Sequence, residues 1–221
     1  MDIIIISADF NEKKKLIFRI SGGILTASGY GIRGCCYFES SGFREKSTHG
    51  ERMKPVRIIA KQPNSKMCFV CGLENRFGLR SRFFELETGE LLGLFRPADE
   101  HQGYPGRLHG GLAATILDET IGRCIMISQS DSIWGVTVEF SMRLRKPIPL
   151  DQEVRVVGRV LKDGKRIFEG SGEILLPGGI VAVEARGKYL KMDISKIADF
   201  DVDEQQWRVR SSDDDPVSIE L

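Results

Sequence analysis

Residues 107–122 read RLHGGLAATILDETIG, and this stretch decides the fold because it predicts one isolated helix. Apolar side chains recur at the spacing of one helix face through residues 111–128, at Leu112, Ile116, Leu117, Ile121 and Ile125. Two glycines stand at the start of this helix, and the acidic pair Asp118-Glu119 lies two turns further on. We therefore expect a helix whose two ends differ in chemistry.

The sequence on either side of this helix predicts strands joined by tight turns. Residues 82–96 form two strand-like runs around Thr88-Gly89, which is a hairpin signal. The segments after the helix that are typical of strands are 133–145, 153–161, 166–176 and 180–191. One helix among long, hairpin-joined strands predicts an α+β fold, in which an antiparallel sheet wraps around the central helix.

Residues 133–145 alternate strictly between apolar and polar side chains. The apolar set is Val136, Val138, Phe140, Met142 and Leu144, and the polar set is Thr137, Glu139, Ser141, Arg143 and Arg145. Because successive side chains of a strand point to opposite faces, we expect the two sets to lie on opposite faces of the sheet.

The composition excludes several classes of protein. The chain has 221 residues, of which 41% are apolar, which is enough for one packed domain with extensions. A formal net charge of +1 argues against a nucleic-acid partner held by bulk phosphate attraction. No run approaches the ~18–20 apolar residues that a membrane helix needs, so we expect no membrane span and a cytoplasmic protein. Five cysteines, an odd number, argue against a disulfide framework.

Charge divides the chain into three regions. Residues 1–66 are rich in Gly and Ser and carry twelve Lys and Arg against six Asp and Glu. We expect a basic N-terminal extension that is poorly structured or follows from a mis-annotated start. Residues 67–192 form the predicted central domain. Residues 193–221, with three basic against nine acidic side chains, form an acidic tail.

The glycine pair Gly110-Gly111 has two physical uses at a helix start. Glycine allows the chain to turn sharply, and it lets a ligand approach backbone N–H groups that lack partners within the helix. Together with the helix dipole, these N–H groups would stabilise an oxygen that develops negative charge, as an oxyanion hole does.

Asp118 lies eight residues after Gly110, which is roughly 12 Å along a helix. A base or nucleophile must lie about 3 Å from its target, so one reacting carbonyl cannot contact both groups on the same helix. If both act on one substrate, they come from two copies of the chain, and the spacing predicts a dimer with sites shared across a two-fold axis. The alternative is that Asp118-Glu119 is a solvated helix face.

Three runs carry a resemblance to a known family. HGGLAATILDETIG, with GVTVEFSMRLRKPIPL and GRVLKDGKRIFEGSGEI further on, resembles the hotdog-fold acyl-CoA thioesterases of the phenylacetyl-CoA-thioesterase-like (PaaI-like) branch. The similarity covers residues 68–192 and includes CFVCGLENRFGL. It implies hydrolysis of a thioester to a free acid and coenzyme A. We expect acyl-CoA as the substrate, a homodimer or a dimer of dimers as the assembly, and no cofactor.

The resemblance also implies roles for single residues. Asp118 is the nucleophile or the general base for water, and the amide of Gly110 polarises the thioester carbonyl. His109 braces the loop, and the hydroxyl of Thr137 holds water or the acid.

One position departs from the family pattern. Gly103, in HQGYPG, stands where many relatives carry an amide or acidic side chain, so a contact to the attacking water is missing unless Gln102 or His101 supplies it. We count Gly111, His101 and Gln102 as candidate substrate-binding residues.

Three basic residues end the strand at 133–145. Coenzyme A carries phosphates, so Arg143, Arg145 and Lys146 are candidates for binding its nucleotide. The alternative is an ordinary solvated strand face.

Residues 68–71, CFVC, form a Cys-x-x-Cys motif. Zinc usually needs four ligands, and no second pair of ligands stands at a suitable spacing. We therefore expect buried structural thiols and no metal site.

Two other functions remain open. A non-catalytic acyl-CoA-binding or regulatory hotdog module is favoured by Gly103. A hydroxyacyl dehydratase is the weaker alternative, because its paired acid would fall near Thr115, which cannot play that part.

Overall fold

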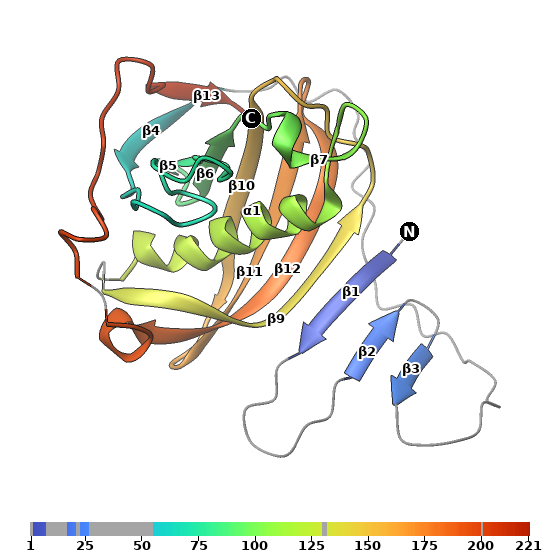
Figure 1. The fold of residues 1–221 in the computed structure, drawn as a ribbon. Coiled ribbons are helices and arrows are strands. Elements are labelled where there is room, and N and C mark those ends of the chain that lie inside the picture. Colours follow the sequence, from blue (N-terminus) through green and yellow to red (C-terminus); the bar gives the residue numbers. More distant parts are fainter. Residues whose placement is uncertain (1, 8–16, 21–22, 27–54, 130–131, 200) are drawn as a thin grey trace.

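A large antiparallel sheet curls around one helix, α1 (Gly110–Arg123), in the computed structural model of the protein (Figure 1). The structure describes residues 2–7, 17–20, 23–26, 55–129, 132–199 and 201–221. Within these residues the sheet has the strand order β13-β4-β5-β6-β10-β11-β12-β9-β1-β2-β3. The prediction of an α+β fold, with an antiparallel sheet wrapped around the helix, is confirmed.

The strands of this sheet are β1 (Asp2–Ser7), β2 (Ile17–Ile20), β3 (Gly23–Thr26), β4 (Pro55–Lys61), β5 (Arg82–Leu86), β6 (Leu91–Phe95), β9 (Ile133–Leu144), β10 (Val154–Asp163), β11 (Ile167–Leu176), β12 (Ile180–Asp193) and β13 (Ser218–Glu220). A separate hairpin precedes α1 and consists of β7 (Gln102–Tyr104) and β8 (Arg107–Leu108). Short 3-10 helices lie at Asp99–His101, Cys124–Ile127 and Ile194–Lys196. Every strand run expected from the sequence is therefore present.

α1 begins at a side-chain cap. His109 has extended backbone, and its Nδ1 accepts a hydrogen bond from the Gly111 N–H at 2.9 Å. The predicted helix continued to residue 128, but the α-helix ends at Arg123 and continues as the 3-10 turn Cys124–Ile127. Among the described residues, no helix has the length and apolar character needed to cross a bilayer.

β9 contains a bulge that changes the facing of its side chains. The pairing with β12 advances by two residues on β9, from Thr137 to Glu139, for one residue on β12, so Val138 is an extra residue. After the bulge Phe140 packs on the core, and before it Thr137 points to α1. The expected strict alternation is therefore wrong at the bulge, because Thr137 lies on the same face as Phe140.

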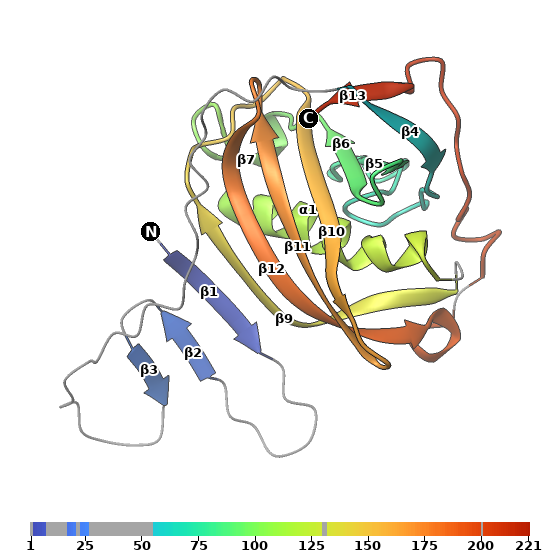
Figure 2. The same ribbon diagram turned by 180° about the vertical axis from the view of Figure 1, so that it is seen from behind.

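α1 lies so close to β10 and β11 that glycine is needed at the facing positions. A Cβ atom at Gly170 would lie 2.4 Å from Ile121 Cγ2, and one at Gly172 would lie 3.0 Å from Ile121 Cγ1. A Cβ atom at Gly158 would lie 2.9 Å from Cys124 Sγ. These glycines therefore set the distance between the helix and the sheet. Figure 2 shows this packing of the helix against the sheet from behind, with β10, β11 and β12 covering α1.

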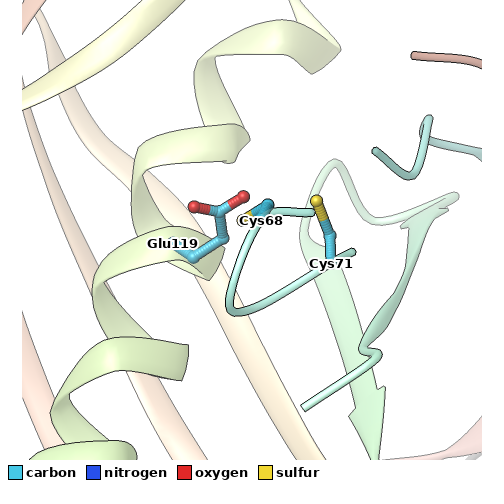
Figure 3. A group of neighbouring side chains, drawn as sticks. All are labelled: Cys68, Cys71 and Glu119. Carbon is cyan, nitrogen blue, oxygen red and sulfur yellow. The ribbon is translucent and has the colours of Figure 1, made fainter. Parts of the chain in front are cut away.

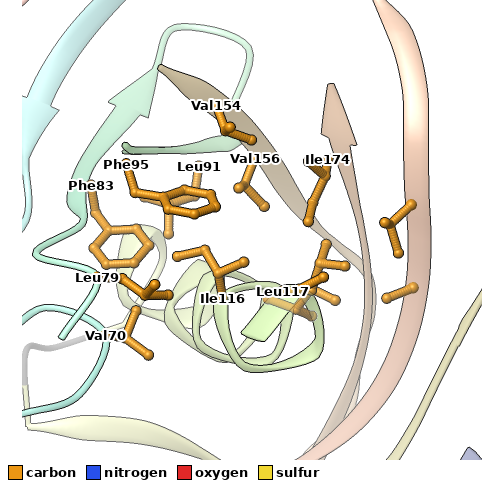
Figure 4. Packing of buried hydrophobic residues seen from close by; sticks show 14 of the residues in the cluster. Val70, Leu79, Phe83, Leu91, Phe95, Ile116, Leu117, Val154, Val156 and Ile174 are labelled. Atoms are coloured by element: carbon orange, nitrogen blue, oxygen red, sulfur yellow. The ribbon is translucent and has the colours of Figure 1, made fainter. Parts of the chain in front are cut away.

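The main core fills the space between α1 and the inner face of the sheet (Figure 4). Ile116 and Leu117 of α1 are fully buried there. They face apolar side chains from the segment before β5 and from β5, β6, β10 and β11, among them Val70, Leu79, Phe83, Leu91, Phe95, Val154, Val156 and Ile174. Burial of these side chains is the main source of the stability of the domain.

Both predicted extensions contribute strands to the sheet. β4 lies before the expected boundary at residue 67 and pairs with β5, and β13 of the acidic tail pairs with β4. The Lys61 Nζ atom lies 2.7 Å from an Asp215 carboxylate oxygen and ties the tail to β4. At the other end of the sheet, β1 pairs with β9. Residues 1, 8–16, 21–22 and 27–54 of the predicted N-terminal extension lie outside the described residues.

Replacing Gly170 with alanine should lower the free energy of unfolding by about 1–3 kcal/mol, because the added Cβ pushes β11 and α1 apart. Urea unfolding followed by circular dichroism measures this change. Ser171→Ala, on the opposite face of β11, is the matched control and should change the unfolding free energy by less than about 0.5 kcal/mol. Equal values for the two variants would show that the close contact is not needed.

Candidate active site

The carboxylate of Asp118 lies where α1 faces β9 and β12. The Thr137 hydroxyl of β9 donates to it, with Oγ1 at 2.8 Å from Oδ1 and 3.1 Å from Oδ2. The Tyr189 hydroxyl of β12 donates to Oδ1 at 3.1 Å. The bulge at Val138 turns Thr137 toward the helix and so makes the first contact possible. The structure therefore brings together two of the predicted residues, Asp118 and Thr137, and adds Tyr189.

Burial raises the pKa of the Asp118 carboxyl above its ordinary value, because the charged form loses hydration. The hydrogen bonds from Thr137 and Tyr189 oppose this effect, while the negative charge of Glu119 adds to it. Since the folded-state pKa lies above the unfolded value, the ionised form reduces stability at neutral pH, and the loss is recovered as pH falls through the folded-state pKa. A carboxylate in this environment is a better proton acceptor than one in water.

A cavity of about 270 Å³ lies beside this carboxylate and is lined in part by Asp118 and Thr137. Most of the remaining large side chains of its wall are apolar or aromatic: Met126, Trp134, Ile197 and Trp207. The ring centroids of Trp134 and Trp207 are 4.8 Å apart. The cavity therefore places an apolar and aromatic wall beside Asp118 and beside the ion pair of Glu119 and Arg123, which also line it.

The other end of α1 holds the predicted amide donors. The Gly111 N–H already donates to His109 Nδ1 within the chain, which is the bracing role expected for His109. At Gly110 a Cβ atom would meet only Leu144 Cδ1, at 3.5 Å, so there is room for an atom to approach the backbone there. We therefore keep the amide of Gly110, and not that of Gly111, as the candidate donor to a carbonyl.

These two ends of the site do not meet within one chain. Gly110 is the first residue of α1, and Asp118 lies two turns along it. At about 1.5 Å rise per residue the separation is roughly 12 Å along the helix axis. Contact of both groups with one carbonyl needs a second copy of the chain.

His101 braces the loop before α1. Its ring is buried, Nδ1 accepts from the Ala98 N–H at 3.0 Å, and Nε2 lies 3.0 Å from the Phe77 carbonyl oxygen. Both ring nitrogens contact the backbone, so the ring braces this loop, and the contact of His101 with substrate stays a prediction.

Gln102 and Gly103 lie on the exposed hairpin before α1. The Gln102 side chain accepts from the Gly106 N–H at 3.2 Å. A Cβ atom at Gly103 would lie 3.0 Å from both Cα and Cδ2 of His109. Glycine at this position therefore lets β7 pack directly against the capping histidine.

The three basic candidates lie at the end of β9 and just beyond it. Arg145 contacts Glu184, with 2.7 Å between Nη2 and Oε1, and Lys146 is exposed. Arg143 lies between Met142 and Leu144, which pack on the core, so its side chain points from the opposite face of the sheet. Within one chain the structure does not bring these residues to Asp118.

Arg123 is a buried cation that the sequence analysis missed. Its Nε donates to Glu119 at 2.7 Å, Nη1 to the Pro63 carbonyl at 3.0 Å and Nη2 to Cys71 Sγ at 3.1 Å. Its guanidinium carbon lies 4.8 Å from the ring centroid of Trp207. Arg123 therefore joins α1 to the segment between β4 and β5 and to the C-terminal segment. Only its spacing of four from Glu119 is a signal that the sequence carries.

The chain matches the family model of the thioesterase superfamily over residues 105–183. Mouse acyl-coenzyme A thioesterase THEM4 is 28% identical over 138 residues, which are 62% of this chain and 58% of the mouse protein. Human acyl-coenzyme A thioesterase 13 is 28% identical over 79 residues, which are 36% of this chain and 56% of the human protein. The chain thus spans less than two thirds of the length of these relatives.

Solved structures share the arrangement of sheet and helix. Thioesterase superfamily protein RHA08564 superposes with a TM-score of 0.51 at 27% identity, covering 56% of this chain and 59% of that chain. The domain has the hotdog fold, and residues 105–183 resemble the thioesterase superfamily. Thioesterase HI1161 from Haemophilus influenzae, at 11% identity and a TM-score of 0.50 over 56% of this chain and 86% of that chain, shows the same fold. The family resemblance of the sequence is confirmed, and α1 is the central helix of the hotdog domain.

Replacing Thr137 with valine should raise the pKa of Asp118 further, because the carboxylate loses its shortest hydrogen bond. Carbon-13 NMR of the carboxyl group, titrated from acid to neutral pH, measures this pKa directly. Thr137→Ser keeps the hydroxyl group and is the matched control, with a pKa near that of the parent protein. If the valine and serine variants titrate together, the hydroxyl does not stabilise the charged form.

Proposed function

We propose that this hotdog protein hydrolyses acyl-CoA thioesters to a free acid and coenzyme A. The observation that carries the proposal is the half-buried carboxylate of Asp118, held by Thr137 and Tyr189 beside an apolar cavity. The relatives named acyl-coenzyme A thioesterases support this substrate class. The sequence motifs favour the PaaI-like branch.

The proposed reaction adds water to the carbonyl carbon of the thioester. Asp118 accepts a proton from this water, or it attacks the carbon itself and forms a mixed anhydride that water then hydrolyses. Its raised pKa makes it a stronger base than an ordinary carboxylate. The carbonyl oxygen gains negative charge, which the N–H of Gly110 and the dipole of α1 stabilise. The carbon–sulfur bond then breaks, and coenzyme A leaves as a thiolate that takes up a proton.

In this proposal each site draws on two copies of the chain. A two-fold axis would bring Asp118 of one copy to the α1 N-terminus of the other, because the two groups lie too far apart along a single helix. The assembly would be a homodimer or a dimer of dimers. We place the reaction in the cytoplasm, without a nucleic-acid or membrane partner and without a cofactor.

The remaining candidates are assigned to the substrate. The cavity beside Asp118 would take the acyl group, because its wall is largely apolar. Arg143, Arg145 and Lys146 would contact the phosphates of coenzyme A in a site formed with the second copy. Gly111 and Gln102 would border the thioester at the α1 N-terminus.

A second candidate function is the binding of acyl-CoA without hydrolysis. It is favoured by Gly103, which has no side chain to hold a water molecule and lies against His109. Tight binding of acyl-CoA with no release of coenzyme A would support this function instead.

Asp118→Asn should lower kcat for acyl-CoA hydrolysis by about 10²–10⁴-fold with little change in KM, because the group that accepts the proton is lost. A panel of aliphatic and aromatic acyl-CoAs with a thiol-reactive dye measures the release of coenzyme A. Asparagine has nearly the same shape and can still accept from Thr137, so the fold is retained. Equal turnover by parent and variant would contradict the role of Asp118.

Mixing two inactive variants should restore activity if sites are shared between copies. The first variant is Asp118→Asn, and the second is Gly110→Pro, which removes the amide proton at a helix position where proline is favoured. In a mixed dimer, one site receives the intact acid from one chain and the intact amide from the other. Random mixing should therefore recover about a quarter of the parental sites.

Activity of refolded or co-expressed mixtures, compared with each variant alone, measures this recovery. Gly110→Ala is the control for the proline variant, because it keeps the N–H and its Cβ meets only one atom, at 3.5 Å. It should retain most of the turnover that Gly110→Pro loses. An inactive mixture with confirmed mixed dimers would place the acid and the amide in separate sites.

A further inference from the structure

The Cys-x-x-Cys motif folds into a tight turn with its two sulfur atoms close together. The Gly72 N–H donates to the Cys68 carbonyl at 2.8 Å, and a Cβ atom at Gly72 would lie 2.3 Å from that oxygen, so only glycine fits. The Val70 N–H donates to Cys68 Sγ at 3.3 Å. A backbone that directs an N–H group at a sulfur atom is well suited to a thiolate ligand.

A third donor reaches this turn from α1 (Figure 3). The carboxylate of Glu119 and the sulfur atoms of Cys68 and Cys71 offer donor atoms that all lie within 4.8 Å of one another. Tetrahedral zinc with Zn–S bonds of about 2.3 Å sets neighbouring sulfur ligands about 3.8 Å apart. Small side-chain rotations that bring the donors about 1 Å closer would therefore complete the geometry of a metal site.

The charges of this cluster also favour a divalent cation. Two thiolates and one carboxylate carry three negative charges, and Arg123, which donates to both Glu119 and Cys71, supplies one positive charge. A divalent ion brings the total to zero. Neutrality matters here because the relative exposure of Cys71 is 1% and that of Arg123 is 5%.

We propose that Cys68, Cys71 and Glu119 bind one Zn²⁺ ion, with water as the fourth ligand. Thiolates favour soft ions such as zinc, and zinc also accepts carboxylate oxygen. Arg123 lies outside the ligand set and donates hydrogen bonds to two of the ligands. The two cysteines lie away from the wall of the cavity beside Asp118, whereas Glu119 contributes to that wall.

The ion would fasten the segment between β4 and β5 to α1. Asn64 already holds this segment together, because its Nδ2 donates to the carbonyls of Cys71 at 2.8 Å and Ser81 at 2.9 Å. The sequence alone favoured structural thiols, because it offered no second ligand pair. The structure changes that inference by bringing Glu119 to the motif.

Titration with Co²⁺ of the reduced, chelator-treated full chain tests this proposal. Cys35 and Cys36 lie outside the described residues, so the protein carries Cys35→Ser and Cys36→Ser throughout. The expected result is one Co²⁺ per chain, with a thiolate-to-cobalt charge-transfer band and the visible bands of four-coordinate cobalt. One equivalent of Zn²⁺ should remove these bands. The readout is independent of thioester hydrolysis, so it does not depend on the proposed function.

Three variants identify the ligands. Cys68→Ser and Cys71→Ser should lose the charge-transfer band, and Glu119→Gln, which can still bond Arg123, should weaken Co²⁺ binding by about tenfold or more. Cys124→Ser, a buried thiol that donates to the Thr120 carbonyl, is the control and should keep the bands. Circular dichroism checks that each variant is folded.

Two results would overturn the proposal. One is that Co²⁺ added to the parent chain produces no thiolate-to-cobalt charge-transfer band. The other is a mass spectrum of the freshly purified protein that shows a Cys68–Cys71 disulfide, with no metal bound after its reduction. Because the titration of the parent chain is decisive by itself, a variant that fails to fold does not leave the question unanswered.

Discussion

The close contact between α1 and the inner face of the sheet is the constraint on which the site depends. Glycine at Gly170 lets Ile121 approach β11 more closely than any larger residue would allow. At this distance the short carboxylate of Asp118 reaches hydroxyl groups on two strands, Thr137 of β9 and Tyr189 of β12. A helix held further from the sheet would leave the same carboxylate in water with an ordinary pKa. The packing of the core therefore also sets the electrostatics of the site.

The two acidic neighbours on α1 have opposite environments. Glu119 is paired with the buried cation Arg123, so its charge is compensated. Asp118 is held by hydroxyl groups, which orient a carboxylate without lowering its pKa as far as a cation in contact would. One carboxylate thus binds segments together, and the other is kept able to exchange a proton. The helical spacing separates the two roles, since consecutive residues point in directions about 100° apart.

Sequence patterns predicted the parts of this structure whose signals are local. The helix, the hairpins and the antiparallel order follow from spacings among neighbouring residues, and Asp118 with Thr137 followed from the family resemblance. The rest depends on contacts between distant segments. Tyr189 comes to Asp118 from the last long strand, and Arg123 reaches Cys71 across the core. No periodicity records such contacts, so they required the fold.

The bulge in β9 has a consequence for insertions and deletions in this strand. Val138 is the extra residue between Thr137 and Phe140, so losing it would restore the regular pleat and still leave the Thr137 hydroxyl toward α1. A strand that kept Val138 but paired regularly would instead turn this hydroxyl to the outer face, and Asp118 would lose its nearest donor although every site residue was still present in the chain. In a comparison of related chains, a one-residue gap at this place therefore does not by itself mark the loss of the site.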